Sequence, residues 1–176
     1  MTPLAGLVAL LAWASISNPG LPWGLIERTD SAEIGIDART VPDFSVTLLD
    51  SETQVSDDSL RGKVVMVDFW SSWCPPCRYE APVLAKVYEE YDPSEVEFLG
   101  IALWDGILQV SEHIRDYEVT YPNALDGTGT VAVDFGVRGL PEKFFVDPDG
   151  KIVKKYIGPL DAESLRRIID GMLESR

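Results

Sequence analysis

The two cysteines of the chain lie in one tetrapeptide, Cys74-Pro75-Pro76-Cys77, and this pair restricts the fold more than any other feature. Two cysteines this close form a loop too small to stabilise a domain, because disulfide stabilisation grows with the length of the closed loop. A four-sulfur zinc site would require two further cysteines. The pair therefore performs redox chemistry, binds a metal with other ligands, or has no special role.

The tetrapeptide stands between two different sequence patterns. Residues 63–70 (KVVMVDFW) are rich in β-branched and aromatic side chains and predict a buried strand. A helix is predicted from about Pro76 to Tyr91. Unpaired N–H groups at a helix N-terminus stabilise an anion, so we expect Cys74 to be the exposed nucleophilic thiolate. Cys77, one turn later, would then resolve the mixed disulfide.

The residues around the two cysteines fit this interpretation. Pro75 and Pro76 suit the first turn of a helix, where a missing N–H costs little. Trp73 would shield one side of the sulfurs. We therefore expect these three side chains to contribute to substrate binding.

The rest of the chain alternates strand and helix patterns. Strands are predicted at 44–48, 96–103, 144–146 and 151–157, and helices at 107–117, 129–135 and 161–173. The segment 147–150 (DPDG) predicts the turn of a hairpin. This order indicates an α/β sandwich around a mixed sheet.

The N-terminal segment differs from this domain. Residues 1–26 contain no charged side chain and predict a membrane anchor. The alternatives are a cleavable signal peptide that ends near Ala14 and a buried helix of the domain. Residues 27–40 are polar and predict a linker. The domain would then cover residues 41–176.

The charge balance limits the partners. Fifteen basic residues face 29 acidic ones, which gives a formal net charge of −14. Phosphate binding requires a basic surface, so a nucleic-acid partner is not expected.

Two segments resemble a known fold family. Residues 67–78 (VDFWSSWCPPCR) resemble the active-site strand and turn of thioredoxin, and residues 136–141 (GVRGLP) resemble the segment that leads into its cis-proline. Glu80, the Pro141-Glu142 pair and the apolar N-terminus are similar to the membrane-tethered TlpA/ResA/CcmG (DsbE) group.

This resemblance implies a thioredoxin fold, with a central mixed β-sheet flanked by helices on both faces. It also implies a cis bond before Pro141, so that the Leu140 backbone faces Cys74 and pairs with an extended substrate chain. No cofactor is implied beyond the redox-active Cys74–Cys77 disulfide, and no metal is expected.

The implied function is an extracytoplasmic disulfide reductase, anchored in the cell membrane. Its clients would be proteins with disulfides, such as apocytochrome c during cytochrome c maturation, and its electron donor a membrane protein of the CcdA/DsbD type. The alternatives are a disulfide-forming oxidant of the same fold and a non-catalytic binding or metallochaperone module.

Four ionisable residues have two interpretations each. Asp68 lies within the apolar strand, where burial would raise its pKa. The resemblance places Asp68 beneath Cys77, where it would take the proton of that thiol. The alternative is that Asp68 lies at a solvated end of the strand. Glu80 shares the helix face of Cys77 and either raises the thiol pKa or is an ordinary acid of a first turn. Glu142 is a second acid at the site or a solvated carboxylate. His113 is expected to be solvated and not a ligand.

Overall fold

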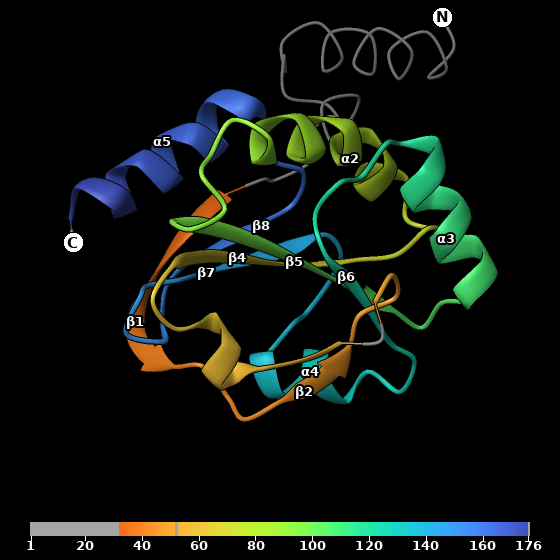
Figure 1. The fold of residues 1–176 in the computed structure, drawn as a ribbon, viewed down its shortest axis with the longest axis horizontal. Coiled ribbons are helices and arrows are strands. Elements are labelled where there is room, and N and C mark those ends of the chain that lie inside the picture. Colours follow the sequence, from red (N-terminus) through yellow and green to blue (C-terminus); the bar gives the residue numbers. More distant parts are fainter. Residues whose placement is uncertain (1–31, 52, 176) are drawn as a thin grey trace, which may run out of the picture.

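The computed structural model describes residues 32–51 and 53–175 of the 176-residue chain. Its centre is a six-stranded sheet in the order β1-β8-β7-β4-β5-β6 (Figure 1). Strands β4, β5 and β6 run parallel, whereas β7 is antiparallel to β4, β8 to β7 and β1 to β8. The strand bounds are β1 Ala32–Thr40, β4 Val64–Trp70, β5 Val96–Leu103, β6 Asn123–Asp126, β7 Glu142–Val146 and β8 Lys151–Ile157.

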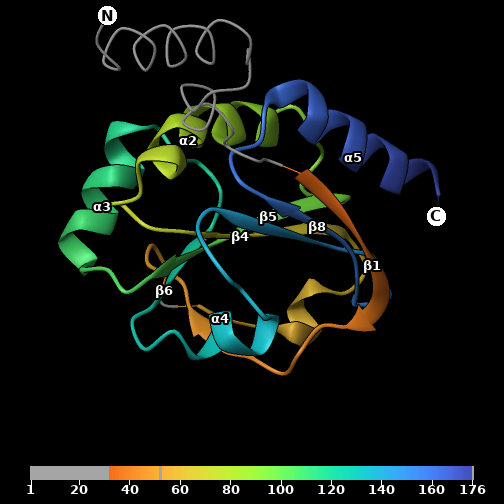
Figure 2. The same cartoon turned by 180° about the vertical axis from the view of Figure 1, so that it is seen from behind.

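Helices cover both faces of this sheet (Figures 1 and 2). One face carries α2 (Pro75–Tyr88), α3 (Ile107–Asp116) and α5 (Ala162–Glu174). The other face carries α4 (Thr130–Phe135), the 3₁₀ turn η2 (Asp57–Leu60) and the small hairpin of β2 (Ser45–Thr47) and β3 (Gln54–Ser56). The expected central mixed sheet with helices on both faces is confirmed.

Strand β4 lies at the centre of the core, and all seven of its residues are buried. Val65, Val67 and Phe69 belong to the apolar cluster on the α4 face. Val64 and Met66 belong to the cluster beneath α2 and α5. A strand with both faces covered reads as a nearly continuous apolar run, which explains the strength of the pattern at residues 63–70.

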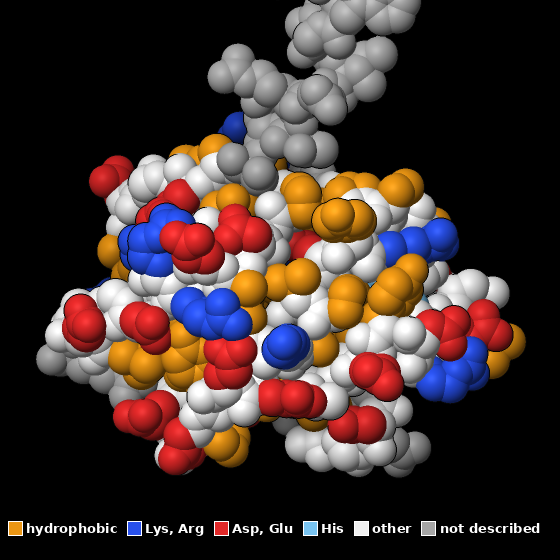
Figure 3. Space-filling view, turned by 90° about the horizontal axis from the view of Figure 1, so that it is seen from above, with side chains coloured by type: hydrophobic (Ala, Val, Ile, Leu, Met, Phe, Trp, Pro, Cys, Tyr) orange, Lys and Arg blue, Asp and Glu red, His pale blue; other side chains and the backbone are white. Residues whose placement is uncertain are grey.

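The outer side of α2, α3 and α5 carries both charged and hydrophobic side chains. Figure 3 shows acidic and basic side chains around scattered hydrophobic ones on this face of the molecule. Arg166 of α5 forms an ion pair with Glu90, just beyond the end of α2, with a nitrogen–oxygen distance of 2.6 Å. The two helices are therefore joined by packing below and by an exposed ion pair above.

The observed bounds of the predicted elements agree with the predicted ones within one residue, except at two places. Helix α2 ends at Tyr88, three residues earlier than predicted. Strand β7 begins at Glu142, two residues earlier than predicted, and so includes Lys143.

The polar segment at 27–40 is the main correction. Residues Ala32–Thr40 form β1, which pairs antiparallel with β8 at the edge of the sheet. The prediction of a linker was wrong for these residues because backbone hydrogen bonds to β8 hold an edge strand whose side chains are mostly exposed. The folded domain therefore includes residues from Ala32 onward, and the predicted anchor at 1–26 lies outside the described residues.

No helix within the described part of the chain combines the length and the apolar character needed to cross a lipid bilayer.

Candidate active site

Cys74 and Cys77 form a disulfide at the start of α2, with their Cα atoms 5.3 Å apart. Cys74 is the N-cap residue of the helix, and Pro75 and Pro76 follow in its first turn. The Cys77 backbone N–H points to the Cys74 sulfur, with a nitrogen–sulfur distance of 3.4 Å. The predicted position of the Cys74 sulfur at the helix N-terminus is confirmed. In the reduced protein, an N–H at this distance would favour a thiolate at Cys74.

The expected exposure of Cys74 was wrong. Cys74 is 4% exposed and Cys77 is 2% exposed. Both belong to a small apolar cluster with Trp70, Ala102 and Val110, and Leu140 packs against it. Side chains from α3 and from the loop before β7 cover the disulfide. The prediction failed because the sequence around Cys74 does not reveal contacts with segments that lie so far along the chain.

Two exposed tryptophans flank the disulfide. Trp73 is 52% exposed and Trp104 is 60% exposed, and the Trp73 indole N–H donates to the Trp104 carbonyl at 3.3 Å. Trp104 also lines a cavity of about 90 Å³ together with Val133 and Leu140. Surface apolar groups at the site therefore come from three separate segments.

The peptide bond between Leu140 and Pro141 is cis, as expected. Pro141 is buried, whereas Leu140 is half-buried and reaches the cluster that contains the two cysteines. Pro75 is exposed and Pro76 is half-buried.

Hydrogen bonds fix the turn between β4 and α2. The Ser71 hydroxyl donates to the Leu103 carbonyl at 2.6 Å, and the Ser72 N–H donates to the Asp105 carboxylate at 2.6 Å. The Arg78 guanidinium donates to the Ser72 carbonyl. The disulfide is thus carried by a segment attached to the end of β5 and to the loop that follows it.

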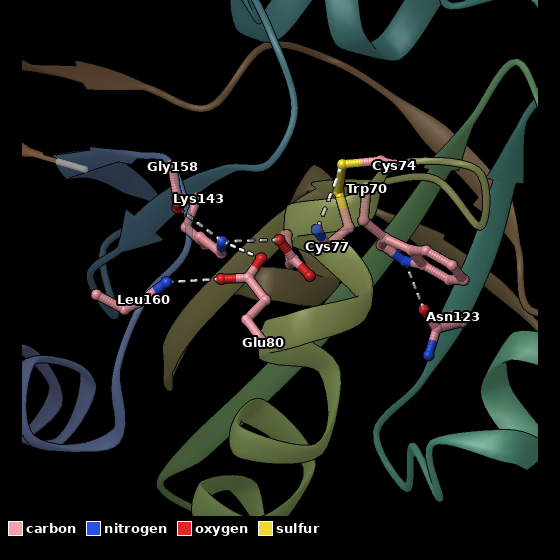
Figure 4. A network of polar contacts seen from close by, with 9 residues as sticks. Trp70, Cys74, Cys77, Glu80, Asn123, Lys143, Gly158 and Leu160 are labelled. Carbon is pink, nitrogen blue, oxygen red and sulfur yellow. Dashed lines mark hydrogen bonds and ion pairs between the residues drawn. A yellow bond between two sulfur atoms is a disulfide. The ribbon is translucent and has the colours of Figure 1, made fainter. Parts of the chain in front are cut away.

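Three ionisable side chains form a buried charge cluster next to the disulfide: Asp68, Glu80 and Lys143. Lys143 is 0% exposed, and its ammonium donates to Glu80 and to the Gly158 carbonyl (Figure 4). The same ammonium lies 3.8 Å from Asp68 Oδ1. The second oxygen of Glu80 accepts the Leu160 N–H at 2.7 Å. One lysine therefore lies between two buried acids.

The packing places this cluster under the first turns of α2. On the face of β4 that α2 covers, Asp68 lies between Met66 and Trp70. Trp70 packs in the cluster of Cys74 and Cys77, and Met66 packs in the cluster of Ala81 and Leu84. Asp68 therefore lies below the stretch of α2 that runs from Cys77 to Ala81.

Burial raises the pKa of both acids, and Lys143 opposes that rise. For Asp68, burial is the largest cause, and the positive charge of Lys143 and a hydrogen bond with Tyr121 lower the pKa in part. For Glu80, burial again raises the pKa most, and Lys143 and the Leu160 N–H act against it. A fully ionised cluster would carry one net negative charge in a dry environment, so it binds a proton more readily than exposed carboxylates do.

Glu142 is not part of this cluster. On β7 it precedes Lys143, so its side chain points to the opposite face of the sheet. There it is 1% exposed, forms an ion pair with Lys155 at 2.6 Å and accepts the Arg138 N–H at 3.2 Å. The structure therefore excludes the solvated setting for Glu142 and places its side chain on the face of the sheet opposite the buried charge cluster.

The expected solvation of His113 was wrong. His113 is 6% exposed, and its ring centroid lies 4.4 Å from that of Trp70 and 4.6 Å from that of Tyr117. Burial, together with the nearby charge of Arg78, lowers the pKa of His113 to about 4. The ring is therefore neutral near pH 7 and supports Trp70 from the side of α3.

Sequence reasoning missed Lys143 and Tyr121. Lys143 directly precedes the predicted strand at 144–146, so alternation along one extra residue would have placed it on the face of Phe145, toward α2. Tyr121 lies in the segment before β6, for which no element was predicted. No local pattern indicates that its hydroxyl meets Asp68.

Comparisons with known proteins identify relatives named as thiol–disulfide oxidoreductases and interchange proteins. The AhpC/TSA family matches residues 38–155. The thiol-disulfide oxidoreductase ResA of Bacillus cereus is 30% identical over 146 residues, which cover 83% of this chain and 82% of the relative. A thiol:disulfide interchange protein DsbE homolog of Paracoccus denitrificans is 33% identical over 164 residues, covering 90% of this chain and 82% of the relative.

A solved structure has the same fold. The thioredoxin family thiol:disulfide interchange protein of Chlorobium tepidum superposes with a TM-score of 0.70 at 27% identity. The match covers 80% of this chain and 99% of that protein.

Proposed function

The chain belongs to the AhpC/TSA family of thioredoxin-like proteins and is a thiol–disulfide oxidoreductase, and from this premise we propose that it reduces disulfides of client proteins outside the cytoplasm. The observation that carries the proposal is the Cys74–Cys77 disulfide at the N-terminus of α2, next to cis-Pro141.

The proposed reaction transfers two electrons to the client. The Cys74 thiolate attacks a client disulfide, which forms a mixed disulfide and releases one client sulfur that takes up a proton. The Cys77 thiol then loses its proton to Asp68, and its sulfur attacks Cys74. The second client sulfur leaves with the electron pair of the broken bond and is protonated, while Cys74 and Cys77 end as a disulfide.

We further propose that the client binds along the Leu140–Pro141 segment. The Leu140 backbone would pair with an extended client chain, and Pro141 offers no N–H that competes for the sulfurs. Trp73, Trp104 and the adjoining cavity of about 90 Å³ supply apolar surface for the client residues beside the cysteine. Pro75 and Pro76 form the remaining edge of this surface.

The proposed location is the outer side of the cell membrane, with residues 1–26 as the anchor or, after cleavage near Ala14, a secreted form. The uncharged and apolar character of residues 1–26 supports this location. Apocytochrome c is the proposed client and a membrane thiol protein of the CcdA/DsbD type the proposed electron donor. A cytochrome c maturation assay in cells that carry Cys74→Ser tests the client.

The first test compares Cys74→Ser with Cys77→Ser in insulin reduction. We expect both variants to lose turnover, because each removes one of the two sulfurs of the cycle. Cys77→Ser should accumulate a mixed disulfide with insulin, since the step that releases the product is missing, whereas Cys74→Ser should form none. Full insulin reduction by Cys74→Ser would rule out the proposed function in favour of a non-catalytic module.

The second test is the reduction potential of the Cys74–Cys77 pair against glutathione. A potential well below that of glutathione supports the reductase, because a difference of about 30 mV corresponds to about 1.4 kcal/mol for a two-electron couple. A potential well above that of glutathione would instead assign a disulfide-forming oxidant.

A further inference from the structure

Lys143 contacts two buried acids but has no role in the reaction proposed for Cys74, Cys77 and Asp68. It is the charged group shared by Asp68 and Glu80, and it is 0% exposed. An ammonium buried in a strand is costly unless partners compensate it, and here two acids do so. A single acid would have been enough to neutralise it.

The two acids differ in how their oxygens are bonded. Glu80 accepts from Lys143 on one oxygen and from the Leu160 N–H on the other, and both bonds favour its ionised form. Asp68 Oδ1 is buried without a hydrogen-bond partner and faces the Lys143 ammonium at 3.8 Å. Asp68 is thus the member of the cluster with an oxygen free to gain and lose a proton.

The groups that face Asp68 come from every element around it. Glu80 comes from α2, Lys143 from β7 and Tyr121 from the segment before β6. On β5 the residue opposite Asp68 is Gly100, which adds no charge. On β8 the residue opposite Lys143 is Tyr156. Lys143 is therefore the one cation among the described residues of this environment.

We propose that Lys143 is a positioning residue for the resolution step: its ammonium, placed between Glu80 and Asp68, keeps Asp68 able to ionise and so able to accept the Cys77 proton. The inference rests on the proposed function and deepens it. In this step the Cys77 S–H bond breaks, its proton moves to an Asp68 oxygen, and the sulfur electron pair forms the bond to Cys74. The thiol attached to Cys74 leaves with the electrons of the broken bond.

The experiment measures both steps with dithiobis(nitrobenzoate) and reduced protein. Attack by Cys74 releases one coloured thionitrobenzoate, and attack by Cys77 on the mixed disulfide releases the second. The rate of the second release is followed from about pH 5 to pH 9, which gives the midpoint for the general base.

Three variants are predicted to change the pH midpoint of the second release in three different ways. In Lys143→Met the midpoint should rise by at least about one pH unit, so that the second release at lower pH slows about tenfold. In Glu80→Gln the midpoint should fall, because Asp68 is then the one acidic partner of the Lys143 ammonium among the described residues. In the double variant Lys143→Met/Glu80→Gln the midpoint should return toward that of the unmodified protein.

Lys155→Met is the matched control. Lys155 is 9% exposed and pairs with the buried Glu142 on the far face of the sheet. Its substitution also breaks a buried ion pair and should lower stability, but it should leave the midpoint unchanged. Urea unfolding of each variant checks that the compared proteins are folded.

The outcomes separate the two proposals. If the first release is absent, Cys74 is not a nucleophile, and the proposed function fails together with the inference. If the first release occurs and folded Lys143→Met leaves the midpoint unmoved, only the inference fails. If Lys143→Met does not fold, the midpoint of Glu80→Gln decides: a fall supports the proposal, and an unshifted value overturns it.

Discussion

At the residue scale, the site contains buried ionisable side chains. Asp68 and Glu80 are both 2% exposed, and their carboxyl groups have raised pKa values because of this burial. In a folded protein such groups keep a proton that an unfolded chain releases at lower pH. The chemistry proposed for Cys77 and the stability of the domain therefore involve the same carboxyl groups.

Replacing Asp68 by Asn should slow turnover and leave the fold intact. The amide is close in size to the carboxyl but cannot accept the Cys77 proton, so the loss in rate should be about 10²–10⁴-fold for a missing general base. Insulin reduction across about pH 6 to 9 measures it. Equal rates of the variant and the unmodified protein over this range would exclude Asp68 from the mechanism.

The same variant tests the effect on stability. Between the ordinary pKa of a carboxyl group and the raised value, the folded state binds more protons than the unfolded state, so the unfolding free energy falls as the pH rises. Each group contributes up to about 1.4 kcal/mol per pH unit in that window. Urea unfolding at about pH 5 and pH 8 should show a smaller fall for Asp68→Asn, and an unchanged slope would contradict the raised pKa.

At the scale of the elements, β4 and β5 need Gly100 to lie beside the active site. A Cβ on Gly100 would lie 1.9 Å from Asn123 Oδ1 and 2.9 Å from Trp70 Nε1. These two atoms form a buried hydrogen bond of 3.0 Å. The bond holds Trp70, which packs against both cysteines, so the missing side chain at Gly100 bears directly on the site.

Gly100→Ala should therefore destabilise the domain by about 2–3 kcal/mol, since overpacking in a dense core forces neighbours to move. Gly171→Ala is the control, because no atom lies within 4 Å of its added Cβ and alanine favours the helix α5. That control should be stabilising by up to about 1 kcal/mol. Urea unfolding measures both, and a neutral Gly100→Ala would show that the Trp70–Asn123 pair adapts.

At the scale of the whole molecule, β1 extends the sheet beyond the region that sequence patterns mark as folded. It pairs with β8 from Ala32↔Ile157 to Thr40↔Lys151. Ile36 packs against the core cluster on the α4 face, and the Arg39 guanidinium donates to the Phe135 carbonyl at 2.6 Å. These contacts connect the edge strand to α4 as well as to β8.

Ile36→Asp should cost about 1–2 kcal/mol of stability, because it places a charge at a half-buried apolar position. Ile34→Asp is the matched control on the same strand, since Ile34 is 38% exposed, and it should cost less than half as much. Urea midpoints of the two variants test this difference. Equal values would mean that β1 adds no core packing to the domain.

The sequence by itself determined the elements whose signals are local. The apolar run at 63–70, the Cys74–Cys77 spacing and the hairpin turn at 147–150 all depend on neighbours along the chain, and the strand, helix start and turn were predicted there. The cis bond before Pro141 was expected from a resemblance alone, because the intrinsic preference of an X–Pro bond is for trans.

Only the tertiary structure decided the surroundings of the disulfide and the edge of the sheet. The burial of Cys74, the stacking of His113 on Trp70 and the strand at 32–40 depend on segments that lie far apart in sequence. Lys143 meets Glu80 and Asp68 because β7 pairs with β4 and α2 covers both strands. Such contacts follow from how the elements pack, and that packing is not encoded in any single stretch of sequence.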